Sequence, residues 1–284
     1  MTRRKSSDRG KNKPAVAALP PLPPRAAMES VLAMFGGGGR RGTPLDQAQD
    51  LMYQAWEASS PARRVALARQ ALEISPDCAD AYVLLVQYSA GGLAESIALL
   101  REGVAAGQRA LGKRVFKDDV GSFWGLLDTR PYMRARAGLA QLLREAGQHE
   151  EAVAHYRDLL RLNPNDNQGL RYELAACLLD LGLDEDLAAL LGQYHDDCSA
   201  TWAYSAALLA FRKGGDDAVA RQLLVEAKKT NPHVPAYLLG KKKLPRRLPD
   251  YIGMGDENEA VVYAISAVAG WKKAVGALDW LRLS

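Results

Sequence analysis

The sequence predicts an all-α fold: a right-handed α-solenoid of about five helical hairpins with a C-terminal capping helix. Composition is the first reason, because alanine and leucine dominate the 48% of hydrophobic residues and aromatic residues reach only 7%. Unbranched side chains lose little rotamer freedom in a helix, which favours helices over strands. The second reason is that apolar residues recur at helical spacing from Thr43 onward, in segments of about 12 to 16 residues.

A regular series of turns is the third reason. Pro76, Pro164 and Pro232 each follow a Ser or an Asn at the end of a predicted helix. Pro164 and Pro232 are 68 residues apart, which is twice 34, and Pro76 and Pro164 are 88 apart, which is twice 34 plus 20. A helix-turn-helix period of 34 residues is typical of the tetratricopeptide repeat (TPR). The polar stretch 163–169 is therefore predicted to be a turn between repeats, in which Asn or Asp caps the next helix, and not an active-site loop.

The repeat units follow from the positions of large and small residues. In the best unit, Leu139 and Ala140 supply the apolar and then small pair at which a partner helix approaches closely, and Gly147 ends the first helix. Leu174 and Ala175 repeat this pair in the next unit. Five TPR-like hairpins are predicted, at residues 45–76, 77–111, 134–164, 168–199 and 200–232.

Three parts are predicted along the chain. Residues 1–42 form a disordered, basic tail rich in Pro and Gly, because they cannot bury enough apolar surface to offset the entropy of ordering. Residues 43–240 form the repeat array, and residues 241–284 form a basic loop and capping helices. The first 44 residues carry nine Lys or Arg against two acidic residues, a charge of +7, which leaves −3 for the remainder of a chain whose net charge is +4.

An insert of twenty residues, 112–131, interrupts the array. It holds Phe116, Phe123 and Trp124, three of the few large aromatic residues. Such an insert either plugs the groove of a solenoid or packs over a helix end. Packing is favoured, because a large aromatic side chain is more often part of a core than a contact for a partner.

The C-terminal region carries motifs that resemble a known family. "NPHVPAYLL" (231–239), "GDENEAVVYA" (255–264) and "WKKAVGALDWL" (271–281) are similar, in this order, to signatures of the eukaryotic suppression-of-tumorigenicity-seven (ST7) proteins. The second motif also reads as a helix start, with Asp256 at the cap and Glu259 three residues on. The resemblance covers roughly residues 134–281. It implies an all-helical repeat fold and a scaffolding role in a bacterial-type, soluble relative, and it supplies no catalytic residue to carry over.

The function predicted from these features is non-catalytic. The chain is expected to bind a peptide or helix of a partner protein in the concave groove lined by the first helix of each hairpin. Arg and Tyr are effective anchors for peptides. The residues expected to project into that groove are Tyr53, Arg134, Gln141, Arg171, Tyr172 and Trp202.

Two alternatives remain open. A cluster of five cations could attract nucleic acid or an anionic surface, together with the basic tail, although such a run usually only solvates a loop. These cations are Lys241, Lys242, Lys243, Arg246 and Arg247. The second alternative is an enzyme that acts through His195, Asp196, Asp197 or Cys198, although a solvated turn is the simpler interpretation of that stretch.

The cysteines and the lengths of the apolar runs indicate in which cellular compartment the protein is expected. Cys78, Cys177 and Cys198 stand apart, with no histidine spaced to complete a zinc site, so neither a metal nor a cofactor is expected. Isolated thiols suggest a reducing compartment. No apolar run approaches the ~20 residues of a membrane span, and the basic start lacks the apolar region of a secretory signal. A cytoplasmic location is expected, with an Arg-rich organellar presequence as the less favoured alternative.

Overall fold

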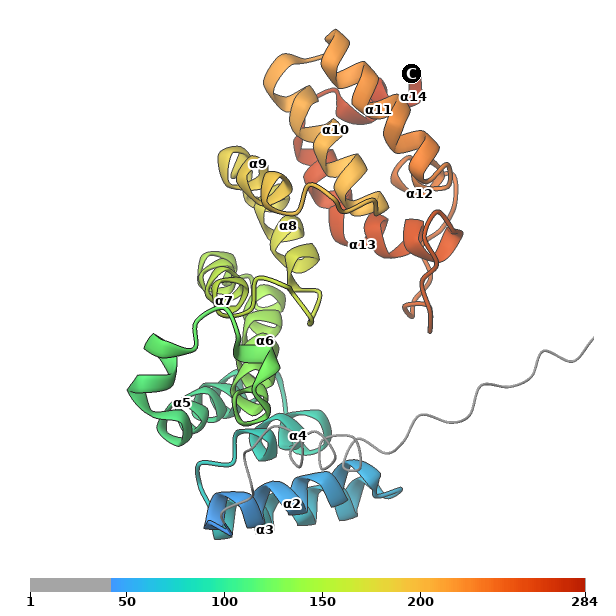
Figure 1. Ribbon diagram of the computed structural model, residues 1–284. Coiled ribbons are helices and arrows are strands. Elements are labelled where there is room, and N and C mark those ends of the chain that lie inside the picture. The colour runs from blue at the N-terminus through green and yellow to red at the C-terminus, as the bar shows by residue number, and fades with distance from the viewer. Residues whose placement is uncertain (1–41, 284) are drawn as a thin grey trace, which may run out of the picture. The chain divides into compact units, whose positions relative to one another are not determined.

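The computed structural model describes residues 42–283, which form an all-α solenoid (Figure 1). No strand occurs within these residues, so the predicted fold class is confirmed. The predicted disordered tail lies outside the described residues, except for Gly42.

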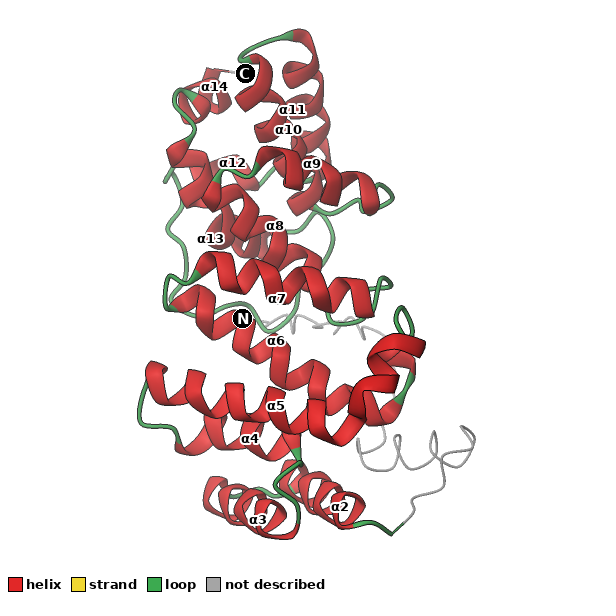
Figure 2. Ribbon diagram, turned by 90° about the vertical axis from the view of Figure 1, so that its left-hand side faces the viewer, coloured by secondary structure: helices red, strands yellow, loops and turns green. Residues whose placement is uncertain are grey.

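Five helical hairpins follow one another along the described chain. The first helices of the hairpins are α2 (Pro44–Glu57), α4 (Ala79–Ser89), α6 (Arg130–Glu145), α8 (Leu170–Leu181) and α10 (Ala200–Gly214). The second helices are α3 (Pro61–Ile74), α5 (Leu93–Asp118), α7 (His149–Leu162), α9 (Asp184–Gln193) and α11 (Ala218–Thr230). Each first helix packs against its own second helix, and each hairpin packs against the next (Figure 2). The five hairpins predicted from the turn signals are therefore present.

The turn at 163–169 has the capping role predicted for it. Asp166 Oδ1 accepts a hydrogen bond from the Leu170 N–H at 2.7 Å, and Oδ2 accepts one from the Arg171 N–H at 3.1 Å. These bonds satisfy two backbone donors that the first turn of α8 leaves without an intrahelical partner. They also hold Asp166 in the left-handed region, at a φ of 48°. The stretch is a turn between repeats, and its carboxylate is engaged by the helix that follows.

Glycine residues let helices approach closely, both between neighbouring hairpins and within one hairpin. A Cβ atom at Gly107 of α5 would lie 2.8 Å from Cβ of Tyr132 in α6, and one at Gly103 would lie 2.9 Å from Cβ of Tyr82 in α4. Any larger residue at these positions would force the helices apart, because the interior of a protein is close-packed.

The insert packs against the solenoid. It begins at Gly112, where α5 kinks at a φ of 69°, and continues into two 3₁₀ turns, η1 (Phe123–Gly125) and η2 (Leu127–Thr129). The Phe123 ring is fully buried, 5.3 Å from the Phe116 ring, which in turn lies 5.0 Å from the Tyr132 ring of α6. The favoured prediction, packing over a helix end, is confirmed for these rings.

Three helices follow the array: α12 (Val234–Leu238), α13 (Glu257–Lys273) and α14 (Ala277–Leu283). Asp256 caps α13 as predicted, since its Oδ1 accepts from the Glu259 N–H at 2.8 Å. The Glu259 carboxylate does not accept from the Asp256 N–H, but its Oε2 accepts from the N–H of Gly255, the residue before the cap, at 2.7 Å. The carboxylate also accepts from the Ala200 N–H at 2.8 Å and from Nδ2 of Asn231 at 3.0 Å, and so fastens α13 to both helices of the fifth hairpin.

No single helix among the described residues has both the length and the apolar character of a membrane span. Within residues 42–283, only α13 and α14 taken together reach that composition, and the chain bends by 113° between them.

Candidate functional site

Successive first helices of the hairpins lie against one another. α2 contacts α4, α4 contacts α6, α6 contacts α8, and α8 contacts α10. We call the surface that these five helices share the first-helix face. The six residues predicted to bind a partner all belong to first helices, three in hairpins 1 to 3 and three in hairpins 4 and 5.

Arg134 is tied to a buried carboxylate on the neighbouring hairpin. Its Nε lies 2.7 Å from Oδ1 of Asp80 and its Nη2 lies 2.5 Å from Oδ2. Asp80 is 0% exposed and also accepts from Nε2 of Gln49 at 2.9 Å. The guanidinium lies 5.3 Å from the centre of the Trp56 ring. A buried carboxylate needs a cationic partner of this kind. Arg134 of hairpin 3 thus contacts Asp80 of hairpin 2 and Trp56 of hairpin 1, and it has this structural role in addition to any role in binding.

Gln141 and Tyr53 share the N-terminal half of the first-helix face with Arg134. Gln141 stands seven residues, or about two turns, after Arg134 and is exposed, which places both on one side of α6. Tyr53 is half-buried, with its ring 5.8 Å from that of Trp56. Gln141 is thus the predicted residue with the most accessible side chain in this half.

Arg171 lies among aromatic rings. Its guanidinium is 4.7 Å from the centre of the Tyr172 ring, 5.2 Å from that of Tyr194 and 5.8 Å from that of Trp202. Trp202 is only 4% exposed, so the expectation that its side chain projects outward is wrong. The reason is tertiary: Tyr194, from the end of α9, and Tyr172 pack their rings edge-on against it.

Two carboxylates complete this group. Asp197 Oδ2 accepts from Nε of Arg171 at 2.8 Å and from the Tyr172 hydroxyl at 2.8 Å. Burial opposes ionisation of Asp197, but hydrogen bonds from Ser199, Tyr172 and Arg171 outweigh it and hold its pKa below the usual value. Burial raises the pKa of Asp166 despite the N–H groups of Arg171 and Leu170. Arg171 and Tyr172 are therefore already engaged within the fold.

The C-terminal half of the first-helix face is covered by α13. This helix packs against α8 and α10, as Figures 1 and 2 show. A Cβ atom at Gly270 would lie 3.1 Å from Cβ of Leu179, so the two helices touch at this glycine. Nη2 of Arg212 donates to the carbonyl oxygens of Leu179 and Gly270, at 3.0 and 2.9 Å, and bridges α8, α10 and α13. The chain's own helix thus occupies part of the predicted groove.

Residues at equivalent positions change from polar in α6 to apolar in α8, the first helix that α13 covers. Leu139 and Leu174 are equivalent positions 35 residues apart, and the same step leads from Gln141 to Ala176 and from Arg144 to Leu179. Ala176 and Leu179 are buried, whereas Gln141 is exposed. Polar residues therefore mark the open part of the face and apolar residues the covered part.

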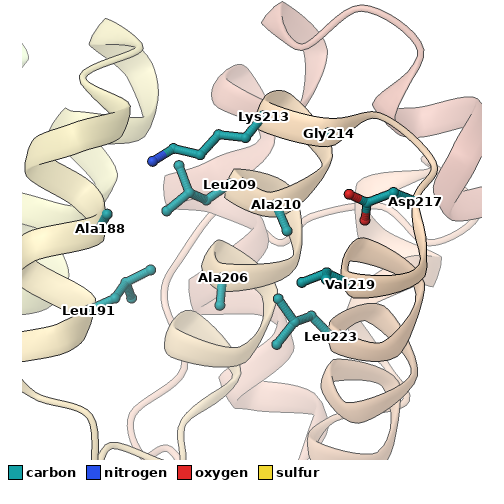
Figure 3. Close-up of a pocket in the computed structure, with 10 residues that line it drawn as sticks. All are labelled: Ala188, Leu191, Ala206, Leu209, Ala210, Lys213, Gly214, Asp217, Val219 and Leu223. Atoms are coloured by element: carbon teal, nitrogen blue, oxygen red, sulfur yellow. The ribbon is translucent and has the colours of Figure 1, made fainter.

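A hollow lies between α9 and the fifth hairpin (Figure 3). This hollow is open to the surface and has a volume of about 550 Å³. Leu191 of α9, Leu209 of α10 and Leu223 of α11 line its apolar floor, while Lys213 and Asp217 stand near its rim. No predicted site residue lies here. Small side chains on α9 and α10, such as Ala188 and Ala206, leave the space open.

The predicted basic cluster lies in the connection between α12 and α13, and its five side chains are exposed. Nζ of Lys242 lies 2.5 Å from Oε1 of Glu257 at the start of α13, so one cation of the five is paired.

The stretch 195–198 is a solvated turn with one side chain directed inward. His195 is 75% exposed at its side chain and Asp196 94%, while Asp197 contacts Arg171. Cys198 is exposed, whereas burial raises the pKa of Cys78 to about 12 and that of Cys177 to about 11. Residues 42–283 contain no group of three or more His, Cys, Asp or Glu side chains able to hold a metal ion.

Comparison with known proteins gives one family. The family described as "ST7 protein" matches residues 42–284. The "Suppressor of tumorigenicity 7 protein-like" of Rattus norvegicus is 32% identical over 260 residues, which cover 84% of this chain and 46% of that protein. The "Suppressor of tumorigenicity 7 protein" of Mus musculus is 31% identical over 282 residues, which cover 84% of this chain and 49% of that protein.

The chain thus spans about half the length of the curated relatives it matches. Among solved structures, that of YrrB, titled "a TPR protein with an unusual peptide-binding site", is 19% identical with a TM-score of 0.44. It covers 66% of this chain and 84% of its own.

Proposed function

We propose that this chain, which belongs to the ST7 protein family, is a non-catalytic scaffold that holds a helix or peptide of a partner protein on the first-helix face of hairpins 1 to 3. The proposed location is the cytoplasm. Because the chain spans about half of its curated relatives, the proposal concerns this repeat array only.

The observation that supports the proposal is the position of α13 against the first-helix face. A helix of this chain already lies on α8 and α10, held by apolar contacts such as Leu179 against Gly270 and by donors such as Arg212. The first-helix face therefore has the spacing needed to accept a helix. The equivalent positions on α6 carry Gln141, which is exposed, and Arg144, which pairs with Glu173 of α8 at 2.6 Å. Gln141 is therefore the polar side chain that is suited to a partner arriving from water.

The contacts of Arg134 and Arg171 decide how this proposal is tested. Replacing Arg134 by Ala would leave the buried Asp80 carboxylate without its cation, and a loss of binding would then report damage to the fold. Arg171 raises the same difficulty through Asp197. Gln141 avoids it, because its side chain is exposed and bonds only to the exposed Glu145.

The experiment places a photo-crosslinking amino acid at Gln141 in the full chain. The matched control places it at Ala154, an exposed position on α7, the second helix of the same hairpin. We expect Gln141 to crosslink one contiguous segment of a partner, identified by mass spectrometry, and Ala154 not to crosslink it.

A synthetic copy of the mapped segment then measures affinity. Gln141→Trp adds bulk to the face and should weaken binding by about tenfold or more, while Ala154→Trp should leave it unchanged. The same crosslinked segment at both positions, or equal affinity in both Trp variants, would show that this face is not the binding surface.

A further inference from the structure

The connection between α12 and α13 forms a loop that projects beyond the helices (Figure 1). We call residues 241–254 the basic–apolar loop. The structure fastens it at both ends. At the first, the Lys242 N–H donates to the Ala236 carbonyl at 2.9 Å. At the second, the Gly253 N–H donates to Oδ2 of Asp256 at 2.9 Å, and Nδ2 of Asn258 donates to the Tyr251 carbonyl at 3.1 Å. The loop is therefore presented in a defined place.

Large apolar side chains are gathered in the second half of this loop. Leu248 is 61% exposed, Tyr251 72%, Ile252 56% and Met254 66%. Elsewhere among the described residues, exposed apolar side chains of this size stand singly or in pairs along the sequence. Four of them lie within seven residues of one projecting loop, and exposed apolar side chains concentrated in this way mark an interaction surface.

The charge of the first half of the loop indicates the charge of the partner. This half carries five exposed cations, against one acidic residue in the whole loop, Asp250. Residues 45–284 carry a net charge of −3, of which the loop contributes +4, so the remainder carries −7 and is opposite in charge to the loop. Charge complementarity thus points to an anionic partner surface.

The two halves together favour one class of anionic surface. A nucleic acid backbone would satisfy the cations, but it offers little apolar material to receive Ile252 and Met254. The interface of an anionic bilayer offers both: phosphate headgroups for Lys and Arg, and an apolar boundary for aliphatic side chains. Tyr251, with an apolar ring and a polar hydroxyl, is a residue type that settles at headgroup level.

We propose that the basic–apolar loop docks this chain on anionic phospholipid surfaces, with the cations of 241–247 on the headgroups and the side chains of Leu248, Tyr251, Ile252 and Met254 in the interface. Docking is peripheral and reversible, because a single loop carries it. Lipid binding of this kind would bring the repeat array close to a membrane while the first-helix face serves a protein partner.

The test is binding of the full-length chain to vesicles of phosphatidylcholine, with and without phosphatidylserine. One variant removes apolar side chains: Tyr251→Ser, Ile252→Ser and Met254→Ser. A second removes charge: Lys241→Gln, Lys243→Gln, Arg246→Gln and Arg247→Gln. Lys242 is retained, because its ammonium group pairs with Glu257 and holds the base of the loop.

Each variant has a matched control elsewhere on the surface. Val219→Ser, Val225→Ser and Val275→Ser remove three exposed apolar side chains. Arg63→Gln, Arg69→Gln, Lys113→Gln and Lys117→Gln remove four exposed cations. All variants keep residues 1–42, so any affinity due to the basic tail is common to them.

We expect the parent to bind phosphatidylserine vesicles far better than pure phosphatidylcholine. A cation near an anionic membrane contributes about fivefold in affinity, so the charge variant should lose more than tenfold. The apolar variant should also lose about tenfold, while both controls stay within about twofold of the parent. The parent already has five Trp residues, so in the Tyr251→Trp variant we expect brominated lipid to quench a larger share of the fluorescence than it does in the parent.

Three results would overturn the proposal. The first is an apolar variant that binds vesicles as well as the parent, which would leave a purely electrostatic loop. The second is binding of polyuridylate that depends on the four cations, together with no loop-dependent vesicle binding, which would assign the loop to nucleic acid. The third is a charge control that loses as much affinity as the loop variant, which would show a nonspecific effect of net charge.

Discussion

The surroundings of His155 in α7 favour the neutral form of its side chain. Burial lowers the pKa of His155, the positive charge of Arg136 acts in the same direction, and Glu151 opposes both. Nε of Arg136 donates to Nδ1 of His155 at 3.0 Å, a bond that requires this nitrogen to carry no proton. Protonation therefore breaks a contact between α6 and α7.

The sign of the pH effect follows from the direction of this shift. The folded-state pKa of His155 lies below that of the unfolded chain, so the unfolded state binds more protons near that pH. The stability contribution is present above about pH 6.5 and is lost as the pH falls through the folded-state pKa. We expect His155→Gln to flatten the fall in unfolding free energy between about pH 7 and pH 5, measured by urea denaturation.

His195 is the control for this prediction, since its side chain is 75% exposed. His195→Gln should retain the pH dependence of the parent. A parent-like slope in His155→Gln would contradict the assignment, and so would a flattened slope in His195→Gln.

Spacing in the sequence identified the helix of each candidate binding residue but not its neighbours. Arg134 and Gln141 fall on the first-helix face as the period predicts. The partner of Arg134, Asp80, lies 54 residues away on another hairpin, and nothing in the local pattern connects them. The burial of Trp202 likewise depends on Tyr194 from a different hairpin. Contacts between repeats decide both cases, and a repeat pattern describes only what recurs within one repeat.

The helix α13 is fitted to α8 through a glycine. Gly270→Leu would drive a side chain into Leu179, because even a Cβ there meets Leu179 atoms at 3.1 to 3.4 Å. Overpacking of this kind costs about 1 to 3 kcal/mol, which exceeds the gain in helix propensity over glycine. We expect Gly270→Leu to lower the free energy of unfolding by about 1 to 2 kcal/mol.

Gly192 of α9 is the matched position, because a Cβ there meets no atom within 4 Å. Gly192→Leu should leave stability unchanged or raise it by up to about 0.8 kcal/mol. The measurement is chemical denaturation of both variants beside the parent. Equal stability of Gly270→Leu and Gly192→Leu would mean that α13 does not press against α8 at this point.

The helices themselves were largely predictable, since proline, glycine and capping residues punctuate the chain at repeat boundaries. The position of α13 on α8 and α10 was not predicted, because a terminal helix is expected to cover the end of an array. A signal was nevertheless present. The exchange of Gln141 and Arg144 for Ala176 and Leu179, one repeat later, places apolar residues on a face that water would otherwise reach. Such a change is expected where another element covers the face.

Residues 42–283 contain two hydrophobic clusters. The smaller joins α2, α3 and α4 through residues such as Met52, Leu67 and Leu84. The larger runs from the start of α4 to α14 and includes Leu208. The Asp80–Arg134 pair and the packing of α4 on α5 and α6 link the two. In a solenoid, each repeat is stabilised by its neighbours only, so a terminal cluster of this size can open separately.

The division into two clusters predicts which helices lose stability when a core residue in either cluster is replaced. Met52→Ala and Leu208→Ala both remove side chains that are fully buried, and each should cost about 2 to 5 kcal/mol in its own cluster. We expect Met52→Ala to speed native-state hydrogen exchange in α2 and α3 while amides of α8 and α10 keep the rates of the parent. Leu208→Ala should speed exchange in α8, α10 and α13. If Met52→Ala accelerates α8 and α10 as much as α2, the two clusters unfold as one cooperative unit, because the contacts that join them are then stronger than the interior of either.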